Sequence, residues 1–134
     1  MSNIKGTCLC GKIEYQIKPP YKFFNYCHCS RCRKSTGSAH AANILLSKKQ
    51  FTWLRGKDYL RRYELLASDI FATTFCIECG SAMPWEIKGH DAIIVPAGTL
   101  DDNPDAFPER NIFWDSKADW YVNVDKLVKF PESN

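Results

Sequence analysis

Short runs of alternating apolar and polar residues predict a chain built mainly of β-strands. Ile13, Tyr15 and Ile17 are separated by single polar residues, which is the two-residue period of a strand with one buried face. Glycine and proline residues interrupt the pattern at short intervals and mark turns. We therefore expect strands over residues 12–17, 40–46, 51–55, 60–66, 70–75, 83–87, 92–97 and 111–114.

Few helices are expected from the same pattern. The candidates are a short turn after Cys29 and the segment over residues 119–125. Because no repeat, linker or low-complexity tract divides the 134 residues, we predict a single domain over residues 1–134. Many short strands with few helices favour a mostly β fold of antiparallel strands. A small β domain of this kind often needs a staple, such as a bound metal.

Composition and charge exclude several classes of protein. The 45% hydrophobic and 25% charged residues are typical of a globular chain and argue against disorder and collagen-like repeats. The formal charge of +3 is small and spread along the chain, so we expect no nucleic-acid partner. Apolar runs stay far below the roughly 20 residues that span a bilayer, and no secretory signal is visible. We therefore expect a cytoplasmic protein without a membrane partner.

Seven cysteines are the outlier in this composition, and an odd number cannot all pair as disulfides. In a reducing compartment, clustered thiols more often bind metal or take part in chemistry. The cysteines fall into three groups. These are a C-x-C-G motif at residues 8–11, a C-x-C-x-x-C motif at residues 27–32 and a C-x-x-C-G motif at residues 76–80.

The first and third groups together offer four thiolates. A glycine after each pair allows a tight backbone turn, so that two sulfurs can converge on one ion, and nearby amides can donate to them. Four thiolates form the closed tetrahedral site of a structural zinc ion. The alternative is two unrelated pairs of buried thiols. We favour the metal site, which would tie the amino-terminal strand to the middle of the chain.

The middle group supplies three ligands, Cys27, Cys29 and Cys32, and no obvious fourth. Zinc with three protein ligands and an open position is the pattern of a reactive site, and an incoming thiol would fill that position well. Three histidines could close the site instead: His28, His40 and His90. The His28 side chain is expected to point away from an ion held by its two neighbours. On spacing alone, open and closed sites are both compatible with the motif.

The order of these motifs resembles a known family. The C-x-C-G motif, then C-H-C-x-x-C-R at residues 27–33 and F-C-x-x-C-G at residues 75–80, is followed by S-K-A-x-W at residues 116–120. This arrangement is similar to that of the glutathione-dependent formaldehyde-activating enzymes, also called the Gfa-like or centromere-protein-V/Gfa domain family. The match covers nearly the whole chain.

The resemblance implies a β-tent fold stapled by two zinc ions. By matching position, the structural zinc is assigned to Cys8, Cys10, Cys76 and Cys79. The catalytic zinc is assigned to Cys27, Cys29 and Cys32. The family's reaction joins glutathione to formaldehyde to give S-(hydroxymethyl)glutathione, and its members are classed as carbon–sulfur lyases. The resemblance therefore implies an enzyme with a small-molecule thiol and a small aldehyde as its partners.

If the protein is such an enzyme, the substrate thiol would take the open position, lose its proton and attack the aldehyde. The two carboxylates of glutathione call for nearby cations, and the candidates are Arg31, Arg33, Lys34 and Lys117. Aromatic residues that could wall a pocket are Phe23, Phe24, Tyr26, Trp114 and Trp120. Possible proton acceptors are Glu78 and Asp115. The same charged and aromatic residues could equally be solvated surface or ordinary core.

Two other functions compete with this reading. The first is a non-catalytic binding module stabilised by zinc, which would not need a three-cysteine site with an open position. The second is a methionine-sulfoxide reductase, whose zinc site is similar. That activity needs a separate reactive cysteine, and all seven cysteines here are already assigned to metal sites.

Overall fold

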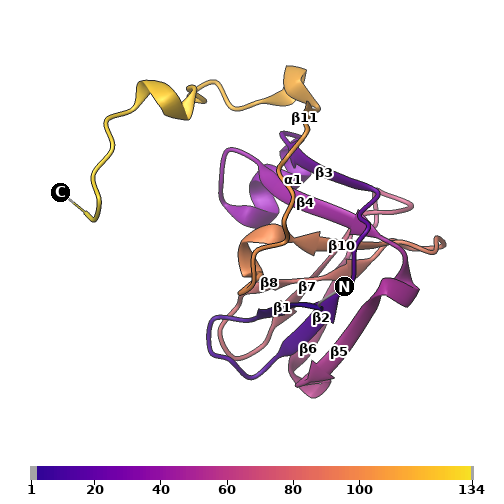
Figure 1. Ribbon diagram of the computed structural model, residues 1–134. Helices are drawn as coiled ribbons and strands as arrows, with labels where there is room; N and C mark the ends of the chain where they lie inside the picture. The colour runs from indigo at the N-terminus through magenta and orange to yellow at the C-terminus, as the bar shows by residue number, and fades with distance from the viewer. Residues whose placement is uncertain (1–2, 134) are drawn as a thin grey trace.

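The computed structural model describes residues 3–133, and within them the chain is mostly β, as the sequence predicts. Its strands form three small sheets (Figure 1). In the first sheet, β2 (Glu14–Ile17) lies between β1 (Ile4–Thr7) and β5 (Phe51–Arg55), and all pairs are antiparallel. The sequence pattern did not predict β1, because one of its two buried positions is Gly6. A Cβ atom there would overlap the ring of Tyr15, so the glycine is required by packing.

The second sheet has five strands in the order β11-β3-β4-β10-β9. They are β3 (Phe23–Cys27), β4 (Ala41–Leu46), β9 (Trp85–Glu86), β10 (Ile93–Pro96) and β11 (Arg110–Ile112). Three of the four pairs are antiparallel, but β11 pairs with β3 in parallel, which the expectation of antiparallel strands did not include. The strand β3 was also missing from the sequence prediction.

The third sheet is β6 (Leu60–Glu64), β7 (Ala72–Cys76) and β8 (Ala82–Met83), again antiparallel. The turn between β7 and β8 carries the second cysteine of the C-x-x-C-G motif. The third sheet therefore places the third cysteine group next to the first sheet.

The α-helix of the described residues is α1 (Ser30–Thr36), which confirms the helical turn predicted after Cys29. Cys29 caps its amino end, where the Cys29 sulfur accepts a hydrogen bond from the Cys32 amide, and Gly37 caps its carboxyl end with a φ of 65°. The segment over residues 119–125 does not form the expected helix. It contributes only to a 3-10 turn over Val124–Lys126. Further 3-10 turns cover Lys48–Gln50, Lys57–Tyr59, Ala97–Thr99 and Trp114–Ser116.

The main core is formed by side chains from all three sheets. Its largest fully buried side chains come from β2, β4, β8 and β10 and from the loop before β2, and include Ile13, Tyr15, Ile17, Ile44, Leu46, Met83 and Val95. Each such side chain contributes roughly 1.5–3 kcal/mol by leaving water. The Tyr15 hydroxyl lies 2.5 Å from the Thr99 hydroxyl, so its polar end is satisfied in the core.

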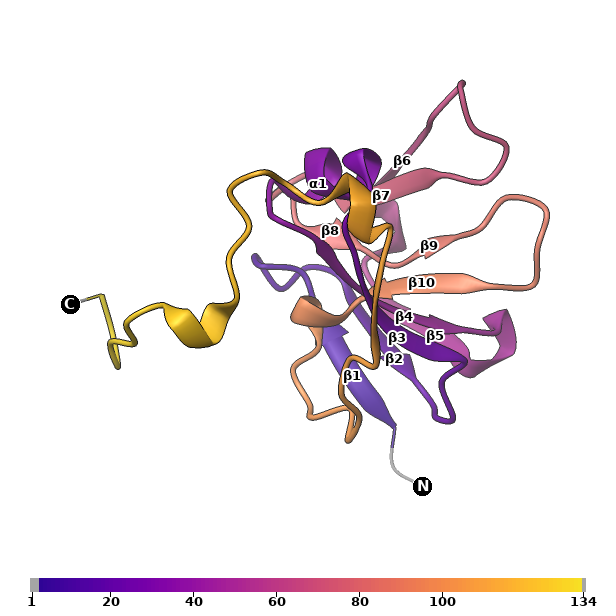
Figure 2. The same cartoon turned by 90° about the horizontal axis from the view of Figure 1, so that it is seen from above.

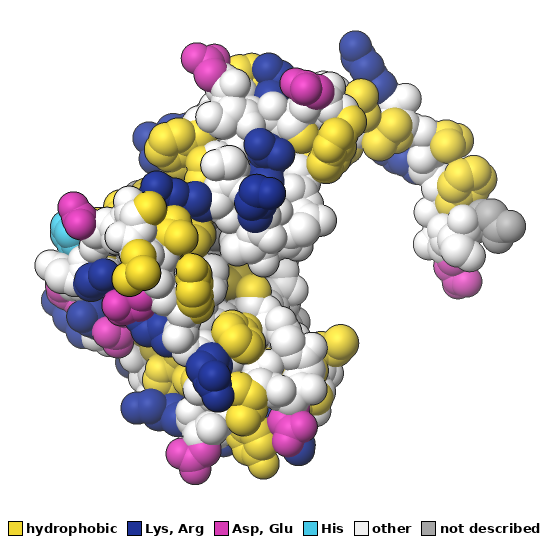
Figure 3. Space-filling model, turned by 180° about the vertical axis from the view of Figure 1, so that it is seen from behind, with side chains coloured by type: hydrophobic (Ala, Val, Ile, Leu, Met, Phe, Trp, Pro, Cys, Tyr) yellow, Lys and Arg dark blue, Asp and Glu magenta, His cyan; other side chains and the backbone are white. Residues whose placement is uncertain are grey.

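The last described residues lead away from the sheets (Figures 1 and 2). Figure 3 shows hydrophobic side chains along this outlying tail, where Trp120, Val124 and Val128 are more than half exposed. Ala118, at its start, is buried. None of the helices within residues 3–133 has the length and apolar character needed to cross a membrane.

Candidate functional site

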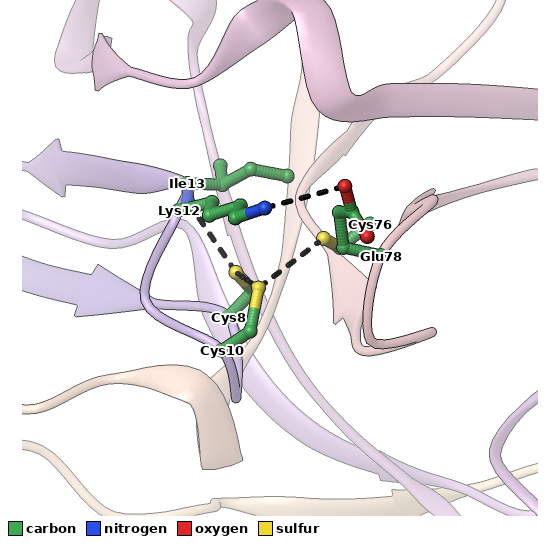
Figure 4. Close-up of polar contacts among 6 residues, drawn as sticks. All are labelled: Cys8, Cys10, Lys12, Ile13, Cys76 and Glu78. Atoms are coloured by element: carbon green, nitrogen blue, oxygen red, sulfur yellow. Dashed lines mark hydrogen bonds and ion pairs between the residues drawn. The ribbon is translucent and has the colours of Figure 1, made fainter.

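The first and third cysteine groups meet in space. The sulfur atoms of Cys8, Cys10, Cys76 and Cys79 all lie within 4.8 Å of one another, as the sequence predicts. Figure 4 shows the sulfurs of Cys8, Cys10 and Cys76 pointing toward a common centre from two separate turns. Four convergent sulfurs are the donor set that structural zinc prefers, so this group could hold a metal ion.

In each of the two turns, the glycine amide donates a hydrogen bond to the carbonyl of the first cysteine of the motif. The Gly11 amide donates to the Cys8 carbonyl at 3.0 Å, and the Gly80 amide donates to the Cys76 carbonyl at 2.8 Å. Both glycines have a positive φ, 81° and 77°, which other residues adopt only with strain. The glycine after each cysteine motif therefore closes the turn that aims the two sulfurs.

Ser81 connects the two turns. Its hydroxyl accepts a hydrogen bond from the Leu9 amide at 2.8 Å and lies 3.3 Å from the Cys79 sulfur. The hydrogen bond with Ser81 lowers the pKa of Cys79 to about 5, which favours the thiolate that a metal needs. An ion pair between Lys12 and Glu78, at 3.2 Å, spans the same two turns at the surface (Figure 4).

The middle cysteine group forms a second cluster. Cys27 ends β3, Cys29 caps α1 and Cys32 lies in the first turn of that helix, and their sulfurs are within 4.8 Å of one another. Hydrogen bonding with the Cys32 thiol lowers the pKa of Cys27 to about 6. This shift favours the thiolate form of Cys27, and the three-sulfur donor set fits a metal ion that accepts thiolates.

The three histidines proposed as a fourth ligand do not join this cluster. His28 is fully buried on the other side of β3, where its Nε2 atom lies 2.9 Å from the Asn111 side-chain oxygen. His40 stacks on the Tyr26 ring with centroids 4.1 Å apart. His90 is exposed and contacts the Lys88 carbonyl. Among the described His, Cys, Asp and Glu side chains, the group therefore has three members, which favours the open site.

A cavity of about 450 Å³ opens beside the three sulfurs, and all three cysteines line it. Its floor is one face of the five-stranded sheet, with Phe23, Asn25 and Cys27 alternating along β3. Its other walls come from the segment before β7, from β9 and from the residue after β11. A smaller cavity of about 230 Å³ is also lined by Cys32 and shares Asn43, Phe71 and Trp85 with the first.

The predicted cationic residues separate into two groups. Arg31 lines the larger cavity, whereas Arg33, Lys34 and Lys117 line neither of the two cavities beside the cluster. The Lys117 ammonium lies 4.7 Å from the centre of the Trp114 ring and makes a cation–π contact with it. The structure therefore brings one of the four predicted cations to the three-sulfur cluster.

Arg110 is a further cation that the sequence did not indicate. Its Nε atom donates to the Asn25 side-chain oxygen at 3.2 Å, and its guanidinium lies 5.8 Å from the Phe23 ring centre. Both contacts are to residues that line the larger cavity. Arg110 reaches them because β11 pairs in parallel with β3, which is a tertiary contact without a local sequence signal.

Several other predicted site residues lie elsewhere. Glu78 forms its ion pair with Lys12 beside the four-sulfur cluster. Asp115 does not line either cavity beside the three sulfurs. Of the predicted aromatic residues, Phe23 lines the cavity and Phe24 is part of the main core. Trp114 packs edge-on against His28, and Trp120 is 66% exposed. The aromatic walls that the sequence analysis missed are Phe71, Trp85 and Phe113.

These features define a class of protein: a mostly β fold with a four-sulfur group that ties two sheets and a three-sulfur group beside a cavity. Comparison with known proteins gives the family. The sequence model of the family described as glutathione-dependent formaldehyde-activating enzyme matches residues 3–116, and the chain belongs to this family.

Two relatives illustrate the similarity. A protein of Halomonas elongata, named provisionally as a glutathione-dependent formaldehyde-activating enzyme, is 25% identical over 123 residues, which cover 87% of this chain and 78% of that protein. A crystal structure of a Rhodobacter sphaeroides protein superimposes with a TM-score of 0.61 at 25% identity. The match covers 80% of this chain and 97% of that one. The resemblance stated from the motifs is confirmed at family level.

Proposed function

We propose that the protein is a zinc-dependent carbon–sulfur lyase of the β-tent fold that joins a thiol to an aldehyde, with glutathione and formaldehyde as the substrates that the family name supplies. The observation that carries the proposal is the group of three sulfurs exposed to a cavity of about 450 Å³. A module that uses metal only for stability has no need for such a cavity beside its ligands.

Two zinc ions per chain fit the two donor sets. The structural ion would be held by Cys8, Cys10, Cys76 and Cys79, and the catalytic ion by Cys27, Cys29 and Cys32. When bound at the second site, zinc lowers the pKa of a thiol that reaches it, which makes the thiolate available at neutral pH.

The reaction itself is an addition. The sulfur–hydrogen bond of the thiol breaks, a carbon–sulfur bond forms to the aldehyde carbon, and the carbonyl π electrons move to oxygen, which takes up the proton. The reverse reaction releases thiol and aldehyde. No oxidant or reductant is needed, and water can carry the proton.

The chain's own residues position the two substrates. Arg31 lines the cavity and Arg110 lies beside it, and the two guanidinium groups are suited to the two carboxylates of glutathione. Asn43 lines both cavities next to Cys32 and can donate a hydrogen bond from its amide to an aldehyde oxygen. These assignments give Arg31 and Arg110 a binding role and Asn43 an orienting role.

The test is the rate of S-(hydroxymethyl)glutathione formation, measured by NMR exchange between glutathione and its adduct. We expect the protein to raise the rate above the uncatalysed reaction. Cys29→Ser should abolish the increase while the protein remains folded, and Ser38→Ala, an exposed change outside both clusters, should leave it intact. A rate equal to the uncatalysed one, or an active Cys29→Ser protein, contradicts the proposal.

A further inference from the structure

The cavity beside the three sulfurs is more apolar than glutathione and formaldehyde require. Eight apolar residues line it and form what we call the eight-residue wall: Phe23, Ile70, Phe71, Trp85, Ile87, Ile94, Ile112 and Phe113. Of the described residues that line it, Arg31 alone has a side chain charged at neutral pH, apart from the cysteines. Formaldehyde contributes a single carbon, and glutathione consists mainly of amides, carboxylates and an amine. Neither substrate has an apolar group that would cover these walls.

The register of the five-stranded sheet shows how the floor is divided. One row across the sheet places Asn25 beside Asn43, so the polar side chains are neighbours. Another row places Ile112 beside Cys27, so an isoleucine adjoins a cluster cysteine on the same face. The apolar wall therefore reaches the atoms where the carbon–sulfur bond would form.

Two aromatic rings pack together in the wall of the cavity. The rings of Phe71 and Trp85 have centroids 5.4 Å apart, and both residues, like Cys32, line both cavities. Their tilt of 52° leaves them splayed, not stacked face to face. A flat apolar group can contact such a pair by edge and face.

Apolar side chains also remain exposed at the larger cavity. Ile70 is 50% exposed and Phe113 is 63% exposed, although both line it. Exposed apolar side chains that gather at a concave site, with a few polar groups at its floor, are typical of a ligand site.

We propose that the enzyme takes an aldehyde that carries an apolar group, aromatic or branched, so that the eight-residue wall binds this group while the thiol lies at the three sulfurs. This inference rests on the proposed function and specifies its second substrate. The aldehyde RCHO and the thiol R′SH give R′S–CH(OH)R. The carbon–sulfur bond forms as the carbonyl π bond breaks, and the thiol proton ends on the new hydroxyl.

The experiment measures binding without turnover, by calorimetry on the zinc-loaded protein. The probes are S-methylglutathione and S-benzylglutathione, which differ only in the group attached to sulfur. We expect the benzyl compound to bind at least about tenfold more tightly than the methyl compound, because its ring leaves water for the apolar wall. Phe113→Ala and Ile70→Ala should each reduce this preference by about threefold or more. Both side chains are half-exposed, so the changes should not unfold the protein.

Phe107→Ala is the matched control, because Phe107 is 84% exposed and does not line the cavity. It should leave the preference unchanged. Equal binding of the two probes, failure of both to bind, or the same loss in Phe107→Ala overturns the inference.

A parallel assay separates this result from the proposed function. Turnover is compared for formaldehyde and phenylacetaldehyde with glutathione, and the larger aldehyde should have the higher kcat/KM. Absence of turnover with both aldehydes contradicts the proposed lyase activity, whereas turnover that is faster with formaldehyde contradicts only the preference for an apolar aldehyde.

Discussion

The Cys10 and Cys76 sulfur atoms lie 3.8 Å apart, although 66 positions separate the two residues in the sequence. Cys10 follows the first strand, and Cys76 ends the strand β7 of another sheet. A metal ion between them would close this long loop and fix the first sheet against the third. The four-sulfur cluster is thus placed to hold the fold, and the three-sulfur cluster to face the cavity.

Cys76→Ser should destabilise the fold strongly. Cys76 is fully buried, and its loss would remove one ligand of the proposed structural zinc, so we expect the free energy of unfolding to fall by about 3 kcal/mol or more. Urea unfolding and zinc content check this together. Cys29→Ser is the comparison: it should lose one zinc per chain with a much smaller loss of stability. Equal destabilisation by the two changes would contradict the division of roles.

Arg31 and Lys34 provide a matched pair on one short helix. Arg31 lines the larger cavity, and Lys34 is exposed away from it. Arg31→Ala should raise KM for glutathione about tenfold, because a charge-assisted hydrogen bond to a carboxylate is lost, with a smaller change in kcat. Lys34→Ala should leave both constants near the wild-type values. Steady-state kinetics with glutathione as the varied substrate make the test, and similar effects of the two changes would argue against a carboxylate site at Arg31.

Gly56→Ala should cost stability through backbone sterics. Gly56 has a φ of 83°, and a Cβ atom there would overlap the carbonyl oxygen of Lys12. We expect a loss of about 1–3 kcal/mol in the free energy of unfolding. Gly98→Ala is the control, since the described residues leave the space around its Cβ position open to 4 Å and its φ is not positive. Denaturant unfolding should give clearly different stabilities for the two variants. Equal stabilities would contradict the close contact between Gly56 and the Lys12 backbone.

His40 should make the stability depend on pH. Burial, and then the charge of nearby His28, lower the pKa of His40 below its ordinary 6.5. The unfolded chain therefore takes up this proton more readily than the folded one. The stability that neutral His40 contributes is fully present above about pH 6.5, and it is lost as the pH falls through the pKa of His40 in the folded state.

His40→Phe keeps a ring against Tyr26 and removes the titrating group. Urea unfolding at pH 7.5 and pH 5.5 measures the loss of stability on acidification. We expect a smaller loss in His40→Phe than in the wild type, because the variant lacks the His40 imidazole. An unchanged loss would mean that His40 does not contribute to the pH dependence.

The cysteine spacing predicted the two clusters because local turns aim the sulfurs. Gly11 and Gly80 each close a tight turn after a cysteine pair, and the helix that begins after Cys29 brings Cys32 close to Cys29. The prediction of a mostly β chain succeeded for a similar reason, since the alternation around Tyr15 is a local signal.

The cavity could not be predicted in the same way. Its walls come from β3, β9 and β11 and from Phe71 before β7, which meet only through tertiary packing. Arg110 reaches the site through the parallel pairing of β11, and β1 was missed because Gly6 occupies a buried position. Charge alone did not distinguish Arg31 from Lys34, because only the helix geometry decides which of them faces the cavity.

The most direct test of the account is cadmium-113 NMR of the cadmium-substituted protein, titrated with glutathione. Two resonances are expected. One should disappear in Cys76→Ser and remain unmoved by glutathione, as for a closed four-sulfur site. The other should disappear in Cys29→Ser and shift when glutathione is added, as for a three-sulfur site open to a thiol. A single resonance, or two resonances whose chemical shifts both stay unchanged when glutathione is added, would contradict the claim that the Cys27, Cys29 and Cys32 cluster is a thiol-binding reaction centre.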